Sequence, residues 1–391
     1  MKTFTNTLTF DIQPRTRLIC GPGSSAEVVS YVKSLVSIGT RPARVLVVSD
    51  AGIVQAGHFG RVADRLREAG LEVGSFHDFG ENPTSGMVDR AVQAAAEFQP
   101  DVLIGLGGGS SLDCCKGMNF VYSGGGRIHD YHGVGKATAD MLPMIAIPTT
   151  SGTGSETQSF ALISDDETHI KMACGDPKAA CKIAVLDPEL TLTQPPRITA
   201  LTGIDALSHA IETYVTRRRN AMSTMYSRQA FGLLARSFEK VIADGSDVNA
   251  RCDMQLGASL AGMAIETSML GAAHATANPL TARHDIVHGQ AVGLMLPAVI
   301  RFNGTEHADW YADLMREIEP EISEKDSPDR LAEQVEDWMR AAGLATSLDE
   351  LSVPSSDIGM FVDDALEQWT GTFNPIALDE DSVRMLYREV A

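Results

Sequence analysis

Short runs of β-branched residues alternate with helical stretches through the first half of the chain, and this alternation constrains the fold most. The strands that we predict lie at residues 44–49, 71–76, 101–106, 144–147 and 183–186, with helices over 53–69 and 86–98. Continuous apolar runs separated by helices are typical of a parallel sheet that is covered on both faces. We therefore expect the first half of the chain to be an α/β domain.

The pattern changes after Asp187-Pro188, where β-rich runs disappear and helical periodicity takes over. The predicted helices cover residues 198–216, 221–243, 247–268, 288–302, 308–318, 326–342, 355–369 and 379–390. A chain of 391 residues is long enough for two or three domains. We predict two: an α/β domain over residues 1–187 and an all-helical domain over residues 188–391.

The charge balance narrows the choice of partners. The chain holds 32 Lys and Arg against 51 Asp and Glu, a net charge of -19, which makes nucleic acid and anionic membranes poor partners. No apolar run approaches the ~20 residues of a membrane span, and Met1 to Phe10 show no apolar core of a signal peptide. The six cysteines form no CxxC pair. We expect a cytoplasmic protein that acts on a small molecule.

Two glycine-rich loops follow predicted strands. Residues 107–113, Gly-Gly-Gly-Ser-Ser-Leu-Asp, come after the strand at 101–106, and residues 148–156, Pro-Thr-Thr-Ser-Gly-Thr-Gly-Ser-Glu, come after the strand at 144–147. Glycines at a strand-to-helix turn let backbone N–H groups approach an anion, and the helix N-terminus adds partial positive charge. A plain tight turn would explain one such loop, but two loops at the carboxyl ends of strands in one sheet favour a dinucleotide site.

Asp50 stands directly after the first predicted strand. An acidic residue there can bind the adenosine ribose hydroxyls of NAD and would repel the 2′-phosphate of NADP. The same residue can equally be the N-cap of the helix that follows. The sequence leaves both interpretations open.

Four polar side chains lie in helical stretches of low polarity. Asp205 and His209 are four residues apart, so they share one helix face, and His274 and His288 stand among small apolar residues. Each imidazole alone could be a core histidine with a hydrogen-bond partner, and Asp205 with His209 could be a simple buried pair. Taken together, three imidazoles and one carboxylate suit a single divalent ion such as Fe²⁺ or Zn²⁺.

These stretches resemble the iron-containing (group III) alcohol dehydrogenase family over nearly the whole chain. The matching pieces are residues 81–84 (Glu-Asn-Pro-Thr), both glycine-rich loops, residues 205–209 followed by Glu212, and the pair His274 and His288, fourteen residues apart. The resemblance implies an N-terminal Rossmann-like domain, a helical C-terminal domain and a metal in the cleft between them. Dehydroquinate synthase has a similar architecture.

The resemblance also implies the roles of individual residues. The metal ligands would be Asp205, His209, His274 and His288. The residues at the cofactor would be Asp50, Asn82, Gly108, Gly109, Ser110, Asp113, Thr149, Thr150, Thr153 and Lys171. In this family an acidic residue at the position of Asp50 goes with NAD rather than NADP. The implied enzyme transfers hydride between a short-chain alcohol or aldehyde and NAD(H). It binds a divalent ion, with Fe²⁺ expected and Zn²⁺ as the alternative, and forms a homodimer or a higher homo-oligomer.

One position departs from the family pattern. Members with alcohol activity usually carry a further His four residues after the ligand His274, where this chain has Asn278. That His is thought to help pass the proton to solvent, whereas Asn cannot titrate and can only position a water or a substrate oxygen. We assign catalytic roles to Asn278 and His288. The alternatives on the same fold are a maleylacetate reductase, a hydroxyacid–oxoacid transhydrogenase, a lyase of the dehydroquinate synthase type, and a non-catalytic scaffold.

Overall fold

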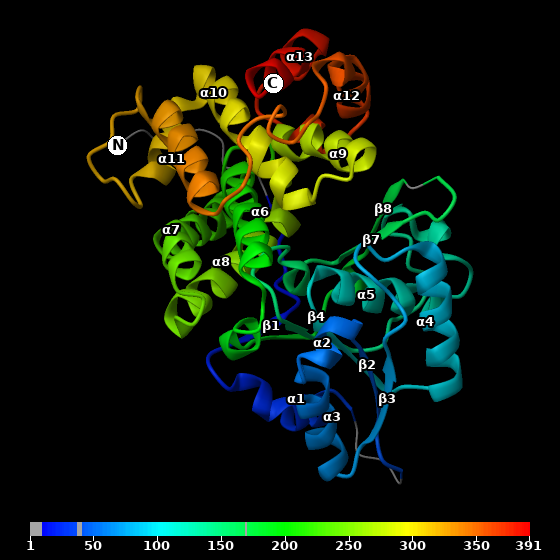
Figure 1. Ribbon diagram of the computed structural model, residues 1–391. Helices are drawn as coiled ribbons and strands as arrows, with labels where there is room; N and C mark the ends of the chain where they lie inside the picture. Colours follow the sequence, from blue (N-terminus) through cyan, green and yellow to red (C-terminus); the bar gives the residue numbers. More distant parts are fainter. Residues whose placement is uncertain (1–9, 37–40, 169) are drawn as a thin grey trace. The chain divides into compact units, whose positions relative to one another are not determined.

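The computed structural model describes residues 10–36, 41–168 and 170–391 (Figure 1). The expectation for Met1 to Phe10 lies almost wholly outside the described residues. The chain forms two compact units. The α/β unit comprises Gln13–Thr150 and Gly154–Gln194, and the helical unit comprises Pro195–Ala391, Ser151–Thr153 and the described residues before 13.

A six-stranded parallel sheet forms the centre of the α/β unit. Its order is β1 (Arg17–Cys20), β9 (Ile183–Leu186), β6 (Met144–Pro148), β4 (Val102–Gly107), β2 (Arg44–Val48) and β3 (Glu72–Phe76). The five predicted strands all form, and the parallel sheet is confirmed. The sequence did not predict β1, because this edge strand has only four residues and pairs with β9 alone.

Helices cover both faces of this sheet, as Figure 1 shows for α1 (Val28–Leu35) and α3 (His58–Glu68) against α4 (Ser85–Phe98) and α5 (Gly109–Gly124). Successive side chains of a strand point to opposite faces. Val45 and Val47 of β2 accordingly pack with α1 and α3, whereas Leu46 and Val48 pack with α4 and α5. The inner strands β4, β6 and β9 are apolar and buried at every position because both faces of the sheet are covered there.

The helix predicted over residues 53–69 is in fact two helices, α2 (Ala51–Gln55) and α3. Gly57 separates them with a φ of 80°, a left-handed conformation that ends one helix and precedes the next. The hydrophobic periodicity continues across the break, so the periodicity alone could not show it.

A second, smaller sheet was not predicted. It contains β5 (Gly133–Val134), β8 (Lys171–Gly175) and β7 (Phe160–Ser164), with β7 and β8 antiparallel. These strands are short and mix polar with apolar residues, because only one of their faces is fully buried.

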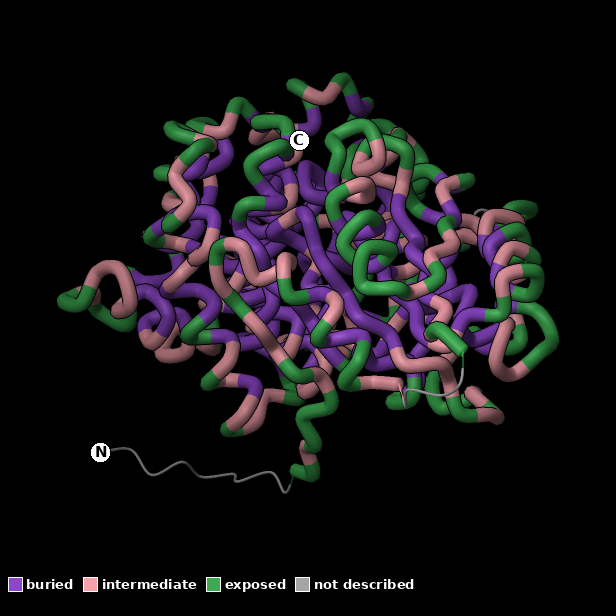
Figure 2. The backbone as a smooth tube through the Cα atoms, turned by 90° about the horizontal axis from the view of Figure 1, so that it is seen from below, coloured by how far each residue is buried: buried purple, intermediate pink, exposed green. Residues whose placement is uncertain are grey.

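The helical unit is built around α6 (Pro196–Tyr214), which is buried along most of its length. Figure 2 colours the buried residues of the whole chain purple. The other helices are α7 (Ala221–Ala243), α8 (Val248–Thr267), α9 (Ala272–His284), α10 (His288–Met315), α11 (Ser327–Ala341), α12 (Ile358–Leu366) and α13 (Glu380–Glu389). The helical second half is therefore confirmed. Two predicted helices, 288–302 and 308–318, join into α10 across a kink at His307, where φ is -125°.

No single helix among the described residues has the length and apolarity that a membrane crossing requires. One bent pair, Val248–Thr267 with Ala272–His284, passes that test by length and composition only.

A buried lysine anchors the second glycine-rich loop to the α/β unit. Lys116 on α5 is fully buried, and its ammonium group donates hydrogen bonds to the carbonyl and hydroxyl oxygens of Ser155, at 2.5 and 2.9 Å. It also donates to the carbonyl oxygens of Gln158, at 2.8 Å, and Phe160, at 2.9 Å. A buried charge needs this number of partners to offset the loss of hydration. The loop geometry therefore depends on Lys116.

We expect Lys116→Met to lower the free energy of unfolding by about 3 kcal/mol, because it leaves buried carbonyl oxygens without donors. Denaturant unfolding followed by circular dichroism measures the change. Lys33→Met on the exposed side of α1 is the matched control, with an expected change within about 0.5 kcal/mol. Equal stabilities for the two variants would contradict the anchoring role.

Candidate active site

The topology of the large sheet places two predicted loops at a switch point. From β2 the chain adds β3 on one side and then crosses to add β4 on the other side. In open α/β sheets, ligands bind outside the carboxyl ends of the strands at such a point. Asp50 follows β2 and the glycine loop begins at the end of β4, so both lie at this place.

Asp50 is tied to the glycine loop by its carboxylate. One oxygen accepts from the backbone N–H of Ile53 at 3.1 Å, so the residue is the N-cap of α2. The other oxygen accepts from the hydroxyl of Ser111 at 3.0 Å. The N-cap interpretation is confirmed, and the carboxylate also stands beside the first turn of α5. Ser111 was not among the predicted site residues, although its hydroxyl in the loop was the signal that could have found it.

The glycine loop has little room for side chains at its first two residues. A Cβ on Gly107, whose φ is 145°, would lie 2.3 Å from the Ser111 hydroxyl oxygen, and one on Gly108 would lie 3.3 Å from Thr150. The N–H of Thr149 donates to the carbonyl of Gly107 at 3.0 Å, so the two loops run side by side. The helix α5 starts at Gly109 with no acidic residue in its first turn. This arrangement suits the binding of a phosphate group.

Three further predicted residues, Asn82, Ser110 and Lys171, are linked by hydrogen bonds. The backbone N–H of Asn82 donates to the Ser110 hydroxyl at 3.1 Å, and the Asn82 side-chain oxygen accepts from the ammonium of Lys171 at 3.3 Å. Asn82 adopts a φ of 50°, a conformation that Asn tolerates better than most residues. These hydrogen bonds link the glycine loop to the small sheet.

Two predicted cofactor residues are placed differently. Both carboxylate oxygens of Asp113 accept hydrogen bonds within the protein, from the Ser155 hydroxyl at 2.7 Å and from the N–H of Leu162 at 3.3 Å. Burial raises the pKa of Asp113. Thr153 belongs to the helical unit. Cofactor contacts of Asp113 and Thr153 stay predictions.

In the helical unit, Asp205, His209 and His274 converge from two helices. Asp205 and His209 lie four residues apart on α6, His274 lies on α9, and all three are buried. From the Oδ1 atom of Asp205, the Nε2 atoms of His209 and His274 are 3.4 and 3.6 Å away. One ligand atom from each residue lies within 4.8 Å of the others. His288, at the start of α10, brings its Nε2 atom to 3.7 Å from the same oxygen.

The donor atoms fit a divalent cation. The Oδ1 atom of Asp205 and the Nε2 atom of His274 are buried and have no hydrogen-bond partner. Unsatisfied buried polar atoms are costly and need an explanation. Ligand atoms bound to one tetrahedral ion at about 2.1 Å lie about 3.4 Å apart, close to the observed spacings. The residues present can therefore hold a metal ion.

The electrostatics of the cluster also favour a cation. Burial opposes the ionisation of Asp205, but the imidazoles around it lower its pKa below the usual range. Burial lowers the pKa of His209. Burial opposes a charge on His274 too, yet the carboxylates of Glu212 and Asp205 outweigh it and raise its pKa to about 9. Asp205 therefore keeps its negative charge although it is buried.

Asn278 lies one helical turn after His274 on α9 and is half-buried. Its side-chain amide donates to the side-chain oxygen of Gln368 at 2.9 Å. The structure thus gives the residue a polar neighbour on a different segment. Gln368 was not predicted, and nothing in the sequence marks it.

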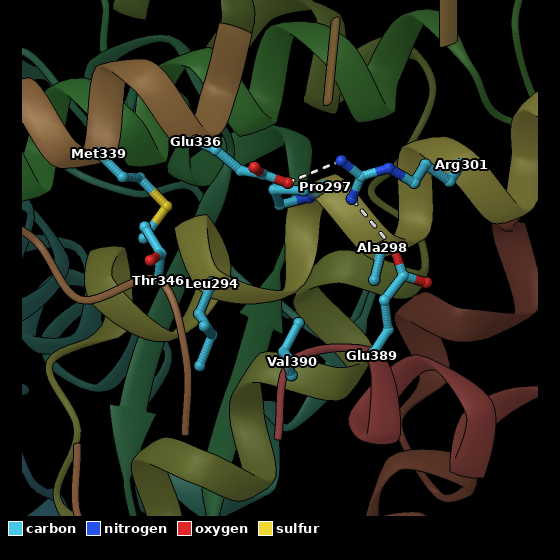
Figure 3. A pocket seen from close by; sticks show the side chains of 9 residues that line it. All are labelled: Leu294, Pro297, Ala298, Arg301, Glu336, Met339, Thr346, Glu389 and Val390. Carbon is cyan, nitrogen blue, oxygen red and sulfur yellow. Dashed lines mark hydrogen bonds and ion pairs between the residues drawn. The ribbon is translucent and has the colours of Figure 1, made fainter. Parts of the chain in front are cut away.

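A small pocket of about 50 Å³ lies elsewhere in the helical unit, between α10, α11 and the end of the chain (Figure 3). Arg301 lines it and forms ion pairs with Glu336 at 2.7 Å and Glu389 at 3.0 Å. Its size allows no more than a few waters. It shares no lining residue with the histidine cluster.

Two family descriptions match the chain. Residues 14–188 match "Iron-containing alcohol dehydrogenase", and residues 199–391 match "Fe-containing alcohol dehydrogenase family, C-terminal". The chain belongs to the iron-containing alcohol dehydrogenase family. The predicted family, and with it the assignment as an oxidoreductase acting on CH–OH groups, is confirmed.

Individual family members agree with this result. An NAD-dependent methanol dehydrogenase of Bacillus methanolicus is 33% identical over 94% of this chain and 96% of its own length. A 1,3-propanediol dehydrogenase of Klebsiella pneumoniae is 30% identical over 88% of this chain and 91% of its own. A crystal structure of 1,3-propanediol oxidoreductase has a TM-score of 0.93 at 28% identity, covering 98% of this chain and 100% of that one. A maleylacetate reductase from Agrobacterium tumefaciens, with a TM-score of 0.80 at 22% identity over 97% of both chains, shows the same fold.

We expect Gly107→Ala to lower the free energy of unfolding by about 2 kcal/mol, because the new Cβ displaces Ser111 and strains the backbone. The control is Gly60→Ala in α3, where a Cβ meets nothing within 4 Å and the expected change is a gain of about 0.5 kcal/mol. Denaturant unfolding of both variants checks the difference. An unchanged stability of Gly107→Ala would show that the turn tolerates a side chain.

Proposed function

We propose that this protein is an NAD- and metal-dependent alcohol dehydrogenase that interconverts short-chain alcohols and aldehydes. The observation that carries the proposal is the convergence of Asp205, His209 and His274, in which the Oδ1 atom of Asp205 and the Nε2 atom of His274 are buried without a hydrogen-bond partner. A metal-independent reductase on the same fold would have no use for such a cluster. The NAD-dependent methanol dehydrogenase among the relatives supports the choice of cofactor and substrate class.

Asp205, His209, His274 and His288 would hold the ion. A bound divalent cation would lower the pKa of an alcohol oxygen or polarise a carbonyl group. His288 is the most exposed of the four, with a third of its side chain accessible. Its place at the first residue of α10 lets it approach from a different direction than the other two imidazoles. Fe²⁺ is the expected ion on the family's description, with Zn²⁺ as the alternative.

The α/β unit would bind the dinucleotide. The bare backbone of Gly108 and Gly109 and the hydroxyl of Ser110 would receive the pyrophosphate at the start of α5. Asp50 would accept hydrogen bonds from the ribose hydroxyls and exclude a 2′-phosphate. Thr149 and Thr150 would line the cofactor from the neighbouring loop, and Asn82 with Lys171 would border it from the small sheet.

Asn278 would serve as a positioning group rather than a proton carrier. An amide neither accepts nor releases a proton near neutral pH. Its hydrogen bond to Gln368 fixes the orientation of the side chain. We infer that Asn278 orients a water or a substrate oxygen, and that water takes the proton.

We further infer a cytoplasmic location and a homodimer or higher homo-oligomer. All six cysteines are free thiols, which suits a reducing compartment. Closed homo-oligomers are the common state of enzymes of this kind.

We expect the purified protein to contain close to one divalent ion per chain, and His274→Ala to lose it. Without the cation, kcat/KM for short alcohols should fall at least a hundredfold, because a Lewis acid supplies several kcal/mol of stabilisation. Elemental analysis and an NAD-linked alcohol assay measure both effects and also distinguish iron from zinc. His307→Ala, which removes an imidazole stacked on Trp310, is the control and should keep metal and turnover. Retention of metal and full turnover by His274→Ala would refute the proposal.

We expect Asp50→Asn to raise the ratio of kcat/KM for NADP over NAD at least tenfold, because it removes the charge that repels a 2′-phosphate. The amide keeps an acceptor for the N–H of Ile53, so α2 keeps its N-cap. Steady-state kinetics with both cofactors measure the ratio. Asp64→Asn, on the exposed side of α3, makes the same charge change at a distance and should leave the ratio unaltered. An unaltered ratio in Asp50→Asn would remove this residue from cofactor selection.

A further inference from the structure

Glu212 is a buried carboxylate on the same face of α6 as Asp205 and His209, and the proposed reaction gives it no role. Only 4% of the residue is accessible to solvent, so its charge must be balanced by hydrogen bonds. Its Oε2 atom accepts a short hydrogen bond from the Nδ1 atom of His274. Its Oε1 atom accepts from the backbone N–H groups of Ala273, at 2.7 Å, and Gly271, at 3.1 Å.

The bond to His274 fixes which ring nitrogen carries hydrogen. An ionised carboxylate can only accept, so the Nδ1 atom of His274 must be the donor. In the neutral imidazole this leaves the lone pair on Nε2, the atom that lies 3.6 Å from Asp205 and has no partner. An outer carboxylate of this kind orients a metal-binding imidazole and increases its basicity.

The other Glu212 oxygen fixes the start of α9, together with Asn374. Asn374 accepts from the N–H of Ala272 at 3.3 Å, so three successive backbone N–H groups end on two side-chain oxygens. Asn374 is held in turn by Asn303 of α10, through two bonds of 3.0 and 2.8 Å. A Cβ on Gly271 would lie 3.1 Å from the oxygen of Asn374 and 3.2 Å from that of Glu212. The beginning of α9 is thus fixed from outside the helix, one turn before His274.

We propose that Glu212 is a positioning residue that selects the Nδ1–H form of His274 and holds the imidazole ready for a divalent cation. The proposal rests on the metal site proposed above. It goes beyond that site because it assigns an effect on metal affinity to a residue that is not one of the four proposed ligands. In the competing explanation, Glu212 only caps the start of α9. The two explanations predict different effects of an amide at this position.

Glu212→Gln separates these explanations because Gln is isosteric but has one acceptor and one donor group. With its oxygen toward Gly271 and Ala273, its NH₂ faces Nδ1 of His274, which forces hydrogen onto Nε2 and blocks the metal-binding lone pair. With its oxygen toward His274, its NH₂ opposes two backbone N–H groups and the start of α9 is lost. In the first orientation the helix cap is kept and only the metal site is damaged.

The experiment titrates the metal-free full-length protein with Co²⁺, read by its visible absorption and by competition with a chelator. We expect Glu212→Gln to bind Co²⁺ 10- to 100-fold more weakly than the wild type, the range seen for outer ligands of metal sites. In Zn²⁺-loaded protein with ¹⁵N-labelled histidine, the Nδ1 proton of His274 should be hydrogen-bonded in the wild type. In the variant it should lose that bond and exchange faster with solvent. Circular dichroism confirms that the variant is folded.

Asn374→Ala is the structural control, because it removes the partner of Ala272 but leaves the bond between Glu212 and His274. We expect it to lower the melting temperature while changing Co²⁺ affinity less than threefold. If Glu212→Gln does not fold, Glu212→Asp replaces it, since it keeps the charge but is one methylene too short to hold all three donors. It should weaken Co²⁺ binding in the same way.

The outcomes are separable. Equal Co²⁺ affinity and an unchanged hydrogen bond of the Nδ1 proton in Glu212→Gln, with a wild type that binds the ion, would overturn the role of Glu212 and leave the proposed function standing. Equal losses of affinity in Glu212→Gln and Asn374→Ala would also overturn it, in favour of general anchoring of α9. A wild-type protein that binds no divalent ion would overturn both proposals.

Discussion

The burial of a charged carboxylate among imidazoles is the interaction on which the helical unit depends. Asp205 lies on α6, the most deeply buried helix of that unit, where an isolated charge would be prohibitively costly. Its neighbours are not the donors that usually neutralise a buried carboxylate, such as arginine or several backbone N–H groups. They are imidazole nitrogens spaced at 3.4 to 3.7 Å from one oxygen. The ion proposed above would balance the charge of Asp205 and occupy the space between these nitrogen atoms.

Two other buried charged groups, Lys116 and Glu212, have hydrogen-bond partners from the protein itself. Lys116 is fully buried, and four acceptors surround its ammonium group. Glu212 is equally buried, and three donors occupy its oxygens. For these two buried charges the chain supplies the partners from its own backbone and side chains. The unpartnered atoms of Asp205 and His274 differ from them in this respect, which supports the ion proposed above.

The sequence predicted most of the architecture because the large sheet is buried on both faces. Its inner strands β4, β6 and β9 are continuous apolar runs, which periodicity identifies well. Periodicity failed where the burial was one-sided or the elements were short, as in β1, β7 and β8. It also missed α9, which contains Pro279 and small residues on every side, so no apolar stripe distinguishes it. That helix carries His274, and its importance was visible only through the histidine.

The candidate site also contains residues that the sequence could predict and residues that it could not. Asp205 and His209 could be paired from their spacing on one helix, and Glu212 could have been added because it continues that face after a further three residues. The contribution of Asn374 could not be predicted, because it comes from a segment 102 residues beyond Ala272, whose N–H it accepts. Asp50 shows a third case, in which two interpretations that the sequence left open are compatible. One oxygen caps α2 while the other accepts from Ser111, so capping the helix does not exclude the proposed contact with a ribose.

The pairing of Asn278 with Gln368 bears on how the site manages protons. A titratable residue at this turn of α9 would exchange protons with the surroundings and would sense the charge of the ion one turn away. An amide pair does neither, because both side chains are neutral at any pH at which the protein is folded. It fixes the orientation of Asn278 instead, because the NH₂ of Asn278 donates to Gln368 at 2.9 Å and Gln368 in turn donates to the carbonyl oxygen of Asp364 at 3.4 Å. In the proposed reaction the proton would then leave through solvent or through the substrate's own neighbours, and Asn278 would act on orientation rather than on acidity.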